Sequence, residues 1–438
     1  MKRNQIHISY PNHMTIWNRI IFISVFILIF FGLQFLVFKT FRKFISVKFP
    51  ASKFLKIISV YPFIIFNLPY IYIIANGFSS ADIPDVIYNF VFLPFYIFQG
   101  AVIFIGLYLL IGKIIKAPFS LSRRILNKVD YFRKFFNKPE VKKIDNSRRA
   151  FLRTTTALVS GYAFTGATLG VLSSHDYEIV NKDLKIENLP PELKGITITL
   201  FCDIHSGPYM KEEMMREYTD VVNDLKSDFI FIPGDFTNSN KMEVHPLANA
   251  FKDLKASKGI YGTLGNHDYF SDPEYVANVI SNETPVRLLR NSPEILSING
   301  KDLCIMGCDD TRQSGSAPDN LLMSYFKSTV DKTRILLSEK NLDFDNTPKL
   351  ALIHKPYFFE DLKDMNLDLI FSGHTHGGQV VLAKFGDVNI SFAGAVSKYI
   401  SGLYRSGKSG MYISRGIGSV ALPIRFNCSP EITKITLV

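Results

Sequence analysis

Long apolar runs without a charge occupy the first part of the chain. Three of them cover residues 20–38, 57–75 and 86–111. Because about 20 apolar residues in a helix cross the roughly 30 Å hydrocarbon core of a bilayer, each run predicts a membrane-spanning helix. A fourth uncharged run, residues 154–172, is rich in Thr, Gly and Ala and is the least apolar of the four. The pattern predicts three transmembrane helices within residues 1–112 and a fourth transmembrane or signal-like helix within residues 154–175.

The pattern is different from residue 185 to residue 438. Short apolar strands alternate there with amphipathic helices, which is typical of an α/β fold. The expected strands are residues 196–201, 229–232, 260–264, 350–353 and 367–371, and the expected helices include 211–225 and 244–254. We therefore predict an α/β domain over residues 185–438.

Charge divides the chain in the same way. The formal net charge is +11, but residues 1–175 carry 22 basic and 5 acidic side chains, whereas residues 176–438 carry 28 and 34. Because the positive charge is confined to the apolar part, a uniformly basic nucleic-acid binder is excluded. The loops 39–56 and 113–153 hold six and thirteen basic residues and the loop 76–85 holds none, so the first two are expected in the cytoplasm.

The fourth run decides on which side the α/β domain lies. If residues 154–172 cross the membrane, everything after them lies outside the cytoplasm; if they do not cross, residues 176–438 stay inside. The sequence SRRAFLR at 147–153 stands just before this run and resembles the twin-arginine export signal of bacteria. The other interpretation is an ordinary basic flank of the cytoplasmic loop 113–153.

Each predicted strand of the α/β domain runs into polar residues of the kinds that bind metal ions. The candidates are Asp203, His205, Asp235, Asn266, His267, Asp268, His354, His374 and His376. Because the carboxyl ends of strands converge at one crevice in open α/β folds, we expect these side chains to meet. Their nitrogen and oxygen atoms suit zinc, iron or manganese. A set of this size fits two ions about 3.5–4 Å apart, the arrangement used for phosphoryl displacement.

The motifs D-x-H, G-D, G-N-H-D, H and G-H-x-H, in this order, resemble those of the calcineurin-like metallophosphoesterases. The resemblance implies an αββα sandwich of two mixed β-sheets. HTHGGQ at 374–379 and the C-terminal RGIG, LPIR and PEI further resemble a membrane-attached bacterial branch of the family. That branch includes twin-arginine-exported phosphoesterases and UDP-2,3-diacylglucosamine hydrolases. We therefore expect a multi-pass protein of the bacterial inner membrane, with its catalytic domain on the extracytoplasmic side.

Matching the motifs position by position gives the expected roles. The resemblance puts three residues on one metal ion: Asp203, His205 and His376. It puts three on the other, with Asp235 bridging: Asn266, His354 and His374. His267 would contact the phosphate and protonate the leaving oxygen, and Asp268 would orient His267. Arg415 and Arg425 are candidates for holding a substrate phosphate.

These roles imply a membrane-anchored phosphoesterase. A hydroxide bridging two divalent or trivalent ions (Mn, Zn or Fe) would attack a phosphodiester or pyrophosphate bond in line. The substrate would be a phosphoester, expected to be lipid-linked or part of the cell envelope. A UDP-diacylglucosamine substrate conflicts with the expected topology, because that nucleotide is made on the cytoplasmic side. The alternative is a metal-binding receptor or scaffold of the same fold without turnover, against which the intact Asn266-His267-Asp268 argues.

Overall fold

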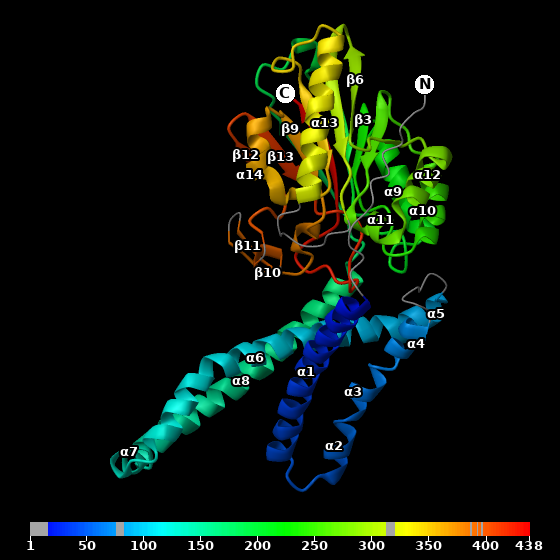
Figure 1. Cartoon of the computed structure of the whole chain (residues 1–438). Coiled ribbons are helices and arrows are strands. Elements are labelled where there is room, and N and C mark those ends of the chain that lie inside the picture. Colours follow the sequence, from blue (N-terminus) through cyan, green and yellow to red (C-terminus); the bar gives the residue numbers. More distant parts are fainter. Residues whose placement is uncertain (1–15, 76–82, 312–319, 386–387, 392, 396) are drawn as a thin grey trace. The chain divides into compact units, whose positions relative to one another are not determined.

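The computed structural model describes residues 16–75, 83–311, 320–385, 388–391, 393–395 and 397–438 (Figure 1). The chain divides into two compact units. One contains residues 1–70 and 97–166, and the other contains residues 71–96 and 167–438.

The first part of the chain is helical. Its helices are α1 (Ile16–Lys48), α2 (Lys53–Ile58), α3 (Tyr61–Ile65), α4 (Pro69–Ala75), α5 (Asp85–Ile87), a π-helical turn (Tyr88–Phe92), α6 (Leu93–Leu126), α7 (Asp130–Phe136) and α8 (Pro139–Leu172). The side-chain amides of Gln34 in α1, Asn67 just before α4 and Gln99 in α6 are joined by hydrogen bonds. Gln34 Nε2 donates to Gln99 Oε1 at 2.8 Å, and Asn67 Nδ2 donates to Gln34 Oε1 at 2.9 Å. Such hydrogen bonds hold apolar helices together where no hydrophobic driving force does.

Within the described residues, three helical stretches are long and apolar enough to cross a membrane: Lys53–Ala75, Tyr88–Leu126 and Pro139–Leu172. They contain or largely overlap the predicted runs 57–75, 86–111 and 154–172, and the last is again the least apolar. The predicted run 20–38 lies within α1, and the side chains at its start are outside the described residues. Length and composition thus suggest association with a membrane, and the predicted domain boundaries stay predictions.

The second unit contains two six-stranded sheets and a hairpin. The first sheet has the order β1-β14-β2-β3-β4-β5, and the second has the order β12-β13-β9-β8-β7-β6. The strands of the first sheet are β1 (Glu178–Leu184), β2 (Thr197–Leu200), β3 (Phe229–Pro233), β4 (Gly259–Thr263), β5 (Arg287–Leu288) and β14 (Glu431–Leu437). Those of the second are β6 (Ser292–Ile298), β7 (Lys301–Cys308), β8 (Lys349–Ile353), β9 (Leu369–Ser372), β12 (Gly402–Ser406) and β13 (Ser409–Ile413), and β10 (Val381–Phe385) pairs with β11 (Val388–Ser391).

Both sheets are mixed, as expected. In the first, β2, β3, β4 and β5 are parallel and β14 is antiparallel to β2. In the second, β7, β8, β9 and β13 are parallel, and β6 and β12 pair with them in the antiparallel sense. The five strands expected from apolar runs are β2, β3, β4, β8 and β9, each within two residues of its expected bounds. Their carboxyl ends carry the candidate ligands.

Alternate residues of each strand point to opposite faces, and this fixes where the cores lie. Leu200 and Phe231 of the first sheet share one apolar cluster with Leu350 and Phe371 of the second, and the rings of Phe231 and Phe371 are 5.3 Å apart. The neighbouring Ile230 packs instead in a cluster with α9 (Glu212–Asp224), α10 (Val244–Phe251) and α12 (Pro273–Glu283). A third cluster joins the second sheet to α13 (Asn320–Glu339) and α14 (Phe359–Leu362) (Figure 1).

The remaining helical pieces are short. They are α11 (Asn266–Ser271) and the 3₁₀ turns Pro191–Leu193, Lys241–Glu243, Pro356–Phe358, Lys363–Met365, His376–Gly378 and Ala393–Ala395. Three of these pieces follow strand ends at the candidate site, namely α11 after β4, Lys241–Glu243 after β3 and His376–Gly378 after β9.

Candidate metal centre

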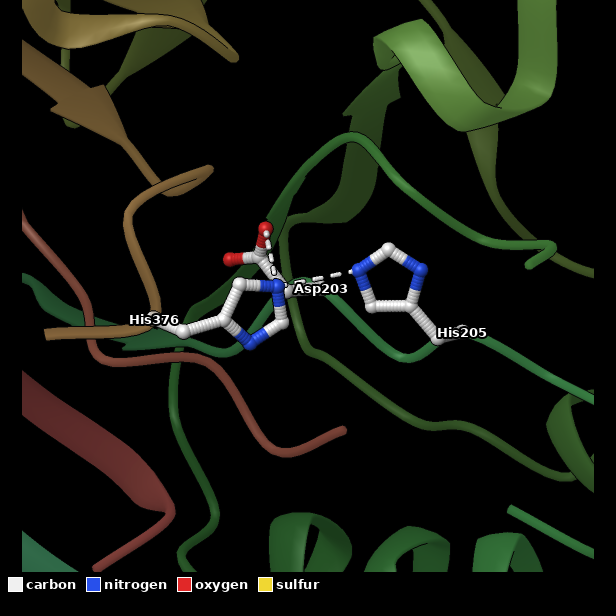
Figure 2. A group of neighbouring side chains, drawn as sticks. All are labelled: Asp203, His205 and His376. Carbon is white, nitrogen blue, oxygen red and sulfur yellow. Dashed lines mark hydrogen bonds and ion pairs between the residues drawn. The ribbon is translucent and has the colours of Figure 1, made fainter. Parts of the chain in front are cut away.

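Three of the predicted ligands meet where β2 and β9 end. Asp203, His205 and His376 each offer a ligand atom, and these atoms lie within 4.8 Å of one another. His205 Nε2 is 3.1 Å from His376 Nε2, and His376 Nε2 is 3.8 Å from Asp203 Oδ1. Figure 2 shows the two imidazoles and the carboxylate pointing toward one another.

A second group lies beside the first. It consists of Asp235, His354 and His374, whose ligand atoms also lie within 4.8 Å of one another. His354 Nε2 is 3.0 Å from Asp235 Oδ2 and 3.1 Å from His374 Nδ1. The same Oδ2 is 3.5 Å from His205 Nε2, so the carboxylate of Asp235 lies between the two groups.

The buried amide oxygen of Asn266 shows whether the candidate residues suit a cation. Asn266 is buried at the start of α11, and its Oδ1 has no hydrogen-bond partner among the described residues. A buried acceptor without a partner costs free energy unless a donor or a cation satisfies it. The nitrogen and oxygen donors also match the preferences of zinc, iron and manganese. The residues therefore fit a site for divalent metal ions, although their individual roles as ligands stay predictions.

Most of the candidate ligands have a strained backbone of the same kind, with a positive φ angle. Five residues without the freedom of glycine have positive φ: Asp203 (51°), His205 (51°), Asp235 (58°), His374 (73°) and His376 (49°). This left-handed region costs an ordinary residue about 1 kcal/mol or more, and such strain is typical of functional sites. Gly265 and Gly373 make the turns possible, because a Cβ at either position would overlap the carboxylate of Asp235 or Asp203.

Burial keeps most of the imidazoles neutral. It lowers the pKa of His205 well below the usual value, and the neighbouring His267 lowers it further. Burial lowers the pKa of His376 well below the usual value too, with Arg425 adding to the effect. The pKa of His374 is lowered in the same way by burial and by His354. A neutral imidazole is the form that binds a metal ion, so these three are held ready to bind one.

His354 and Asp235 form a tightly coupled pair. Burial alone would lower the pKa of His354, but the carboxylate of Asp235 raises it to about 10. Burial alone would raise the pKa of Asp235, but His354 and then His267 bring it well below its usual value. His354 Nδ1 lies 2.8 Å from the carbonyl oxygen of Pro233, to which it can donate, and this directs Nε2 into the site. Binding of a cation would therefore release a proton from this pair.

His267 is the half-buried imidazole next to the first group. Its Nδ1 lies 2.5 Å from the carbonyl oxygen of Asn238 and can donate a proton only there. Its backbone N–H donates to Asp235 Oδ1 at 2.9 Å, and its ring centroid lies 4.6 Å from that of His205. The ring is thus fixed with Nε2 as the atom left for proton transfer.

Among the described residues, the carboxylate of Asp268 bonds to the backbone and to Thr237 and makes no direct hydrogen bond to the His267 ring that it was predicted to orient. Its carboxylate accepts hydrogen bonds from the backbone N–H groups of Gly265, Phe236 and Thr237, at 2.9, 3.2 and 2.9 Å, and from the Thr237 hydroxyl. Adjacent residues on a helix point in different directions, so the side chain of Asp268 points to the loop after β3 while that of His267 points to the candidate metal site. Burial, followed by the charge of Asp235, raises the pKa of Asp268 to about 7.

Glu243 holds the loop that supports His267, and the sequence analysis did not select it. Its Oε2 accepts the backbone N–H groups of Asn238, Ser239 and Asn240 at 3.0, 2.7 and 2.9 Å. Its backbone carbonyl accepts the Ser206 hydroxyl at 2.7 Å, next to His205. One buried carboxylate therefore fixes the carbonyl that His267 uses. The sequence signal is a capping box, Asn240 followed three residues later by Glu243.

Replacing Glu243 by glutamine should loosen His267 without removing any predicted ligand. The charged acceptor becomes a neutral one, and hydrogen bonds to charged groups are roughly twice as strong as neutral ones. We expect turnover to fall about tenfold, or about 1.4 kcal/mol of barrier, with metal content unchanged. Steady-state kinetics of the full chain measure this, with the exposed Glu283→Gln as control. Equal turnover in the two variants would contradict the role of Glu243.

Both predicted phosphate-holding arginines are engaged by the protein. Arg425 is buried, and its guanidinium donates to the carbonyl oxygens of Gly418, Arg415, Gly416 and Cys428. Its Nη2 also lies 3.3 Å from His376 Nδ1. Arg415 pairs with Glu178 at 2.8 Å and Glu431 at 2.5 Å. The geometry gives these arginines a part in building the RGIG loop, and it lends no support to their binding a substrate.

A buried ion pair next to His354 was also missed. Lys355 Nζ lies 2.6 Å from Asp310 Oδ1, and each side chain is only 1% exposed. Asp310 follows β7 and Lys355 follows β8 by two residues, so the pair closes the ends of neighbouring parallel strands. The signal in the sequence is an aspartate and a lysine, each two residues after a strand whose last residues are apolar and buried, where a lone charge would be costly.

Comparison with known proteins agrees with this geometry. The family described as calcineurin-like phosphoesterase matches residues 196–378, which contain every predicted ligand. An uncharacterized metallophosphoesterase of Bacillus subtilis, YkuE, is 28% identical over 298 residues, covering 66% of this chain and 97% of that protein. The phosphodiesterase YaeI of Escherichia coli is 24% identical over 301 residues, covering 67% of this chain and 99% of that protein.

A relative in zebrafish shares only part of its length with this chain. It is named a transmembrane protein with metallophosphoesterase domain, and it is 27% identical over 270 residues, or 59% of this chain and 57% of that protein. The chain thus spans little more than half of this relative. Together the matches support a place in the calcineurin-like metallophosphoesterase family, and they suggest a phosphoester substrate and membrane association.

Proposed function

We propose that this chain is a membrane-anchored, metal-dependent phosphodiesterase whose catalytic domain is an αββα sandwich. The observation that carries the proposal is the convergence of two carboxylates, four imidazoles and the unpaired Asn266 oxygen at the strand ends. Preference for a diester rests on the name of the Escherichia coli relative, a phosphodiesterase. The apolar helices favour a lipid-linked or envelope substrate.

Two divalent ions would be held by the two groups around Asp235. In this proposal Asp203, His205 and His376 hold one ion. Asn266, His354 and His374 hold the other, with Asp235 between them. The chemistry that bound ions supply is Lewis-acid activation of a water and neutralisation of charge on the phosphoryl oxygens.

His267 supplies the proton for the leaving group in this proposal. With Nδ1 directed to the Asn238 carbonyl, a proton on Nε2 is the one that His267 can give to a departing alkoxide. The ring is half-buried whereas His205 and Asp235 are buried, so a substrate can reach it. In this proposal the ring is oriented through Asn238 and Glu243, and Asp268 acts only through its hydrogen bonds to the same loop.

Hydrolysis of a generic diester tests the proposal. The purified full chain, loaded with manganese or zinc, should hydrolyse bis(p-nitrophenyl) phosphate faster than p-nitrophenyl phosphate. His267→Ala should slow the reaction by about 100-fold or more, the usual contribution of a general acid. His245→Ala is the matched control, because His245 Nε2 lies 2.8 Å from the Tyr275 hydroxyl and His245 belongs to none of the candidate groups. A metal-loaded chain that is inert on both substrates would favour a receptor or scaffold without turnover.

The proposed location of the catalytic domain is outside the cytoplasm of a bacterial cell, reached by a fourth span in α8 and the twin-arginine route. Thirteen basic residues in 113–153 and the SRRAFLR sequence support this. We expect alkaline phosphatase fused after Val438 to be active in intact cells. The same reporter fused after Arg153 should be inactive, and the opposite pattern would place the catalytic domain in the cytoplasm.

A further inference from the structure

A groove of about 320 Å³ lies in the helical unit, and none of the predicted ligands lines it. It is lined by Arg42 of α1 and, from the segment containing α2 and α3, by Lys56, Ile57, Val60, Tyr61 and Ile64. Its volume is at the lower end of the roughly 300–1,000 Å³ of small-molecule sites. One end of this lining is cationic and the rest is mainly apolar.

The two cations have no acidic partner within the described part of the chain. The segment 39–56 holds six basic residues and no acidic one. The guanidinium of Arg42 lies 5.8 Å from the ring centroid of Phe38, and Lys56 Nζ donates to the carbonyl oxygen of Pro50 at 2.8 Å. Two cations without an acidic partner beside one groove attract an anion. An arginine can bind two phosphate oxygens through two parallel hydrogen bonds.

The apolar wall indicates what else the ligand must contain. Ile57 is 61% exposed, Ile64 53% and Tyr61 52%. All three belong to Lys53–Ala75, a stretch apolar and long enough to span a membrane. A small inorganic anion would leave this wall bare, whereas an acyl chain would cover it.

The position of the charges along the helices fits the edge of a bilayer. Arg42 stands one turn beyond the uncharged run 20–38, and Lys56 stands immediately before the run 57–75. Both cations are therefore at the same end of the two runs, near the turn between α1 and α2. This is the depth of lipid headgroups, where basic pockets between helices bind anionic lipids.

We infer that the groove binds an anionic phospholipid, with Arg42 and Lys56 on its phosphate and an acyl chain along Ile57, Val60 and Ile64. This site is separate from the proposed catalytic centre and does not depend on it. The lipid would fasten the turn between α1 and α2 to the membrane surface.

Native mass spectrometry of the full chain tests the inference. We expect phosphatidylglycerol to stay bound to the chain at lipid concentrations where phosphatidylcholine does not. The Arg42→Gln/Lys56→Gln variant should lose at least about tenfold in occupancy, because basic residues at an anionic surface attract the lipid headgroup. The Lys48→Gln/Lys53→Gln variant is the control, because it removes the same charge from the same turn but from outside the groove.

Three outcomes would overturn the inference. Equal loss in the two variants would mean general attraction to the basic turn, and equal binding of the two lipids would mean that the anion is not recognised. Displacement of phosphatidylglycerol by inorganic phosphate alone would mean a free-phosphate site. The Arg42→Lys/Lys56→Arg variant keeps both charges and should keep the lipid. The comparison of two lipids on the unaltered chain needs no variant to fold.

Discussion

Replacing Asp235 by asparagine is expected to abolish hydrolysis of bis(p-nitrophenyl) phosphate, with a loss of at least about 1,000-fold, or about 4 kcal/mol of barrier. Oδ2 of Asp235 lies 3.0 Å from His354 Nε2 and 3.5 Å from His205 Nε2, so one oxygen serves both candidate groups. Asparagine keeps the shape and can still accept the His267 N–H through Oδ1, but it loses the charge that would attract two cations. Turnover at saturating manganese measures the effect.

Asp228→Asn is the matched control for this prediction. Asp228 is another aspartate of the α/β unit, half-buried where Asp235 is buried, and it pairs with Lys258 at 2.7 Å outside the candidate groups. We expect its turnover to stay within about twofold of the unaltered chain, less than 0.5 kcal/mol of barrier. If Asp235→Asn turns over as fast as this control, the position of Asp235 between two metal ions is wrong.

The second large effect should come from Lys355→Met. Breaking a buried ion pair leaves an uncompensated charge and costs about 3–5 kcal/mol. Asp310 would be left with that charge, and its Oδ2 already has no hydrogen-bond partner among the described residues. For a domain of this size the melting temperature should fall by roughly 10 °C. A thiol-reactive dye can measure it, because all four cysteines are free and buried.

Two further variants separate a broken pair from a lost side chain. The double variant Lys355→Met/Asp310→Leu should melt higher than Lys355→Met, because replacing both charges by apolar groups removes the unpaired one. Lys363→Met breaks an exposed pair with Glu360, at 3.2 Å, and should shift the melting temperature by no more than about 2–3 °C. Equal shifts for Lys355→Met and Lys363→Met would contradict the importance of the buried pair.

The strand ends could be predicted from the sequence because each buried apolar run is followed at once by polar residues and glycines. A wholly buried strand such as β3 is visible in the sequence as an apolar run. A polar residue just after such a run is expected to have a partner, because a buried polar group without one is costly. The motifs Asp203-x-His205 and His374-x-His376 follow two such strands, and the structure brings their side chains together. Their backbone strain was not readable, because positive φ depends on the packing around each turn.

The partners of the site residues could not be predicted in the same way. Asp268 and His267 are adjacent in sequence, but their side chains contact different groups of the loop after β3, the N–H of Thr237 and the carbonyl oxygen of Asn238. Arg425 is a predicted phosphate ligand, whereas four backbone carbonyl oxygens and His376 Nδ1 surround its guanidinium. Such pairings join residues far apart in the chain, and no local pattern specifies them. The Lys355–Asp310 pair, 45 residues apart, escaped prediction for the same reason. Glu243 differs, because its capping box with Asn240 is a local signal in the sequence.

Metal content tests the central claim most directly. The full chain, stripped with a chelator and reloaded with manganese, should bind about two ions per molecule, as a two-metal phosphoesterase does. Hydrolysis of bis(p-nitrophenyl) phosphate should return as the second ion binds. A chain that binds no divalent ion after reloading, or that hydrolyses the diester equally well while stripped, would contradict the account.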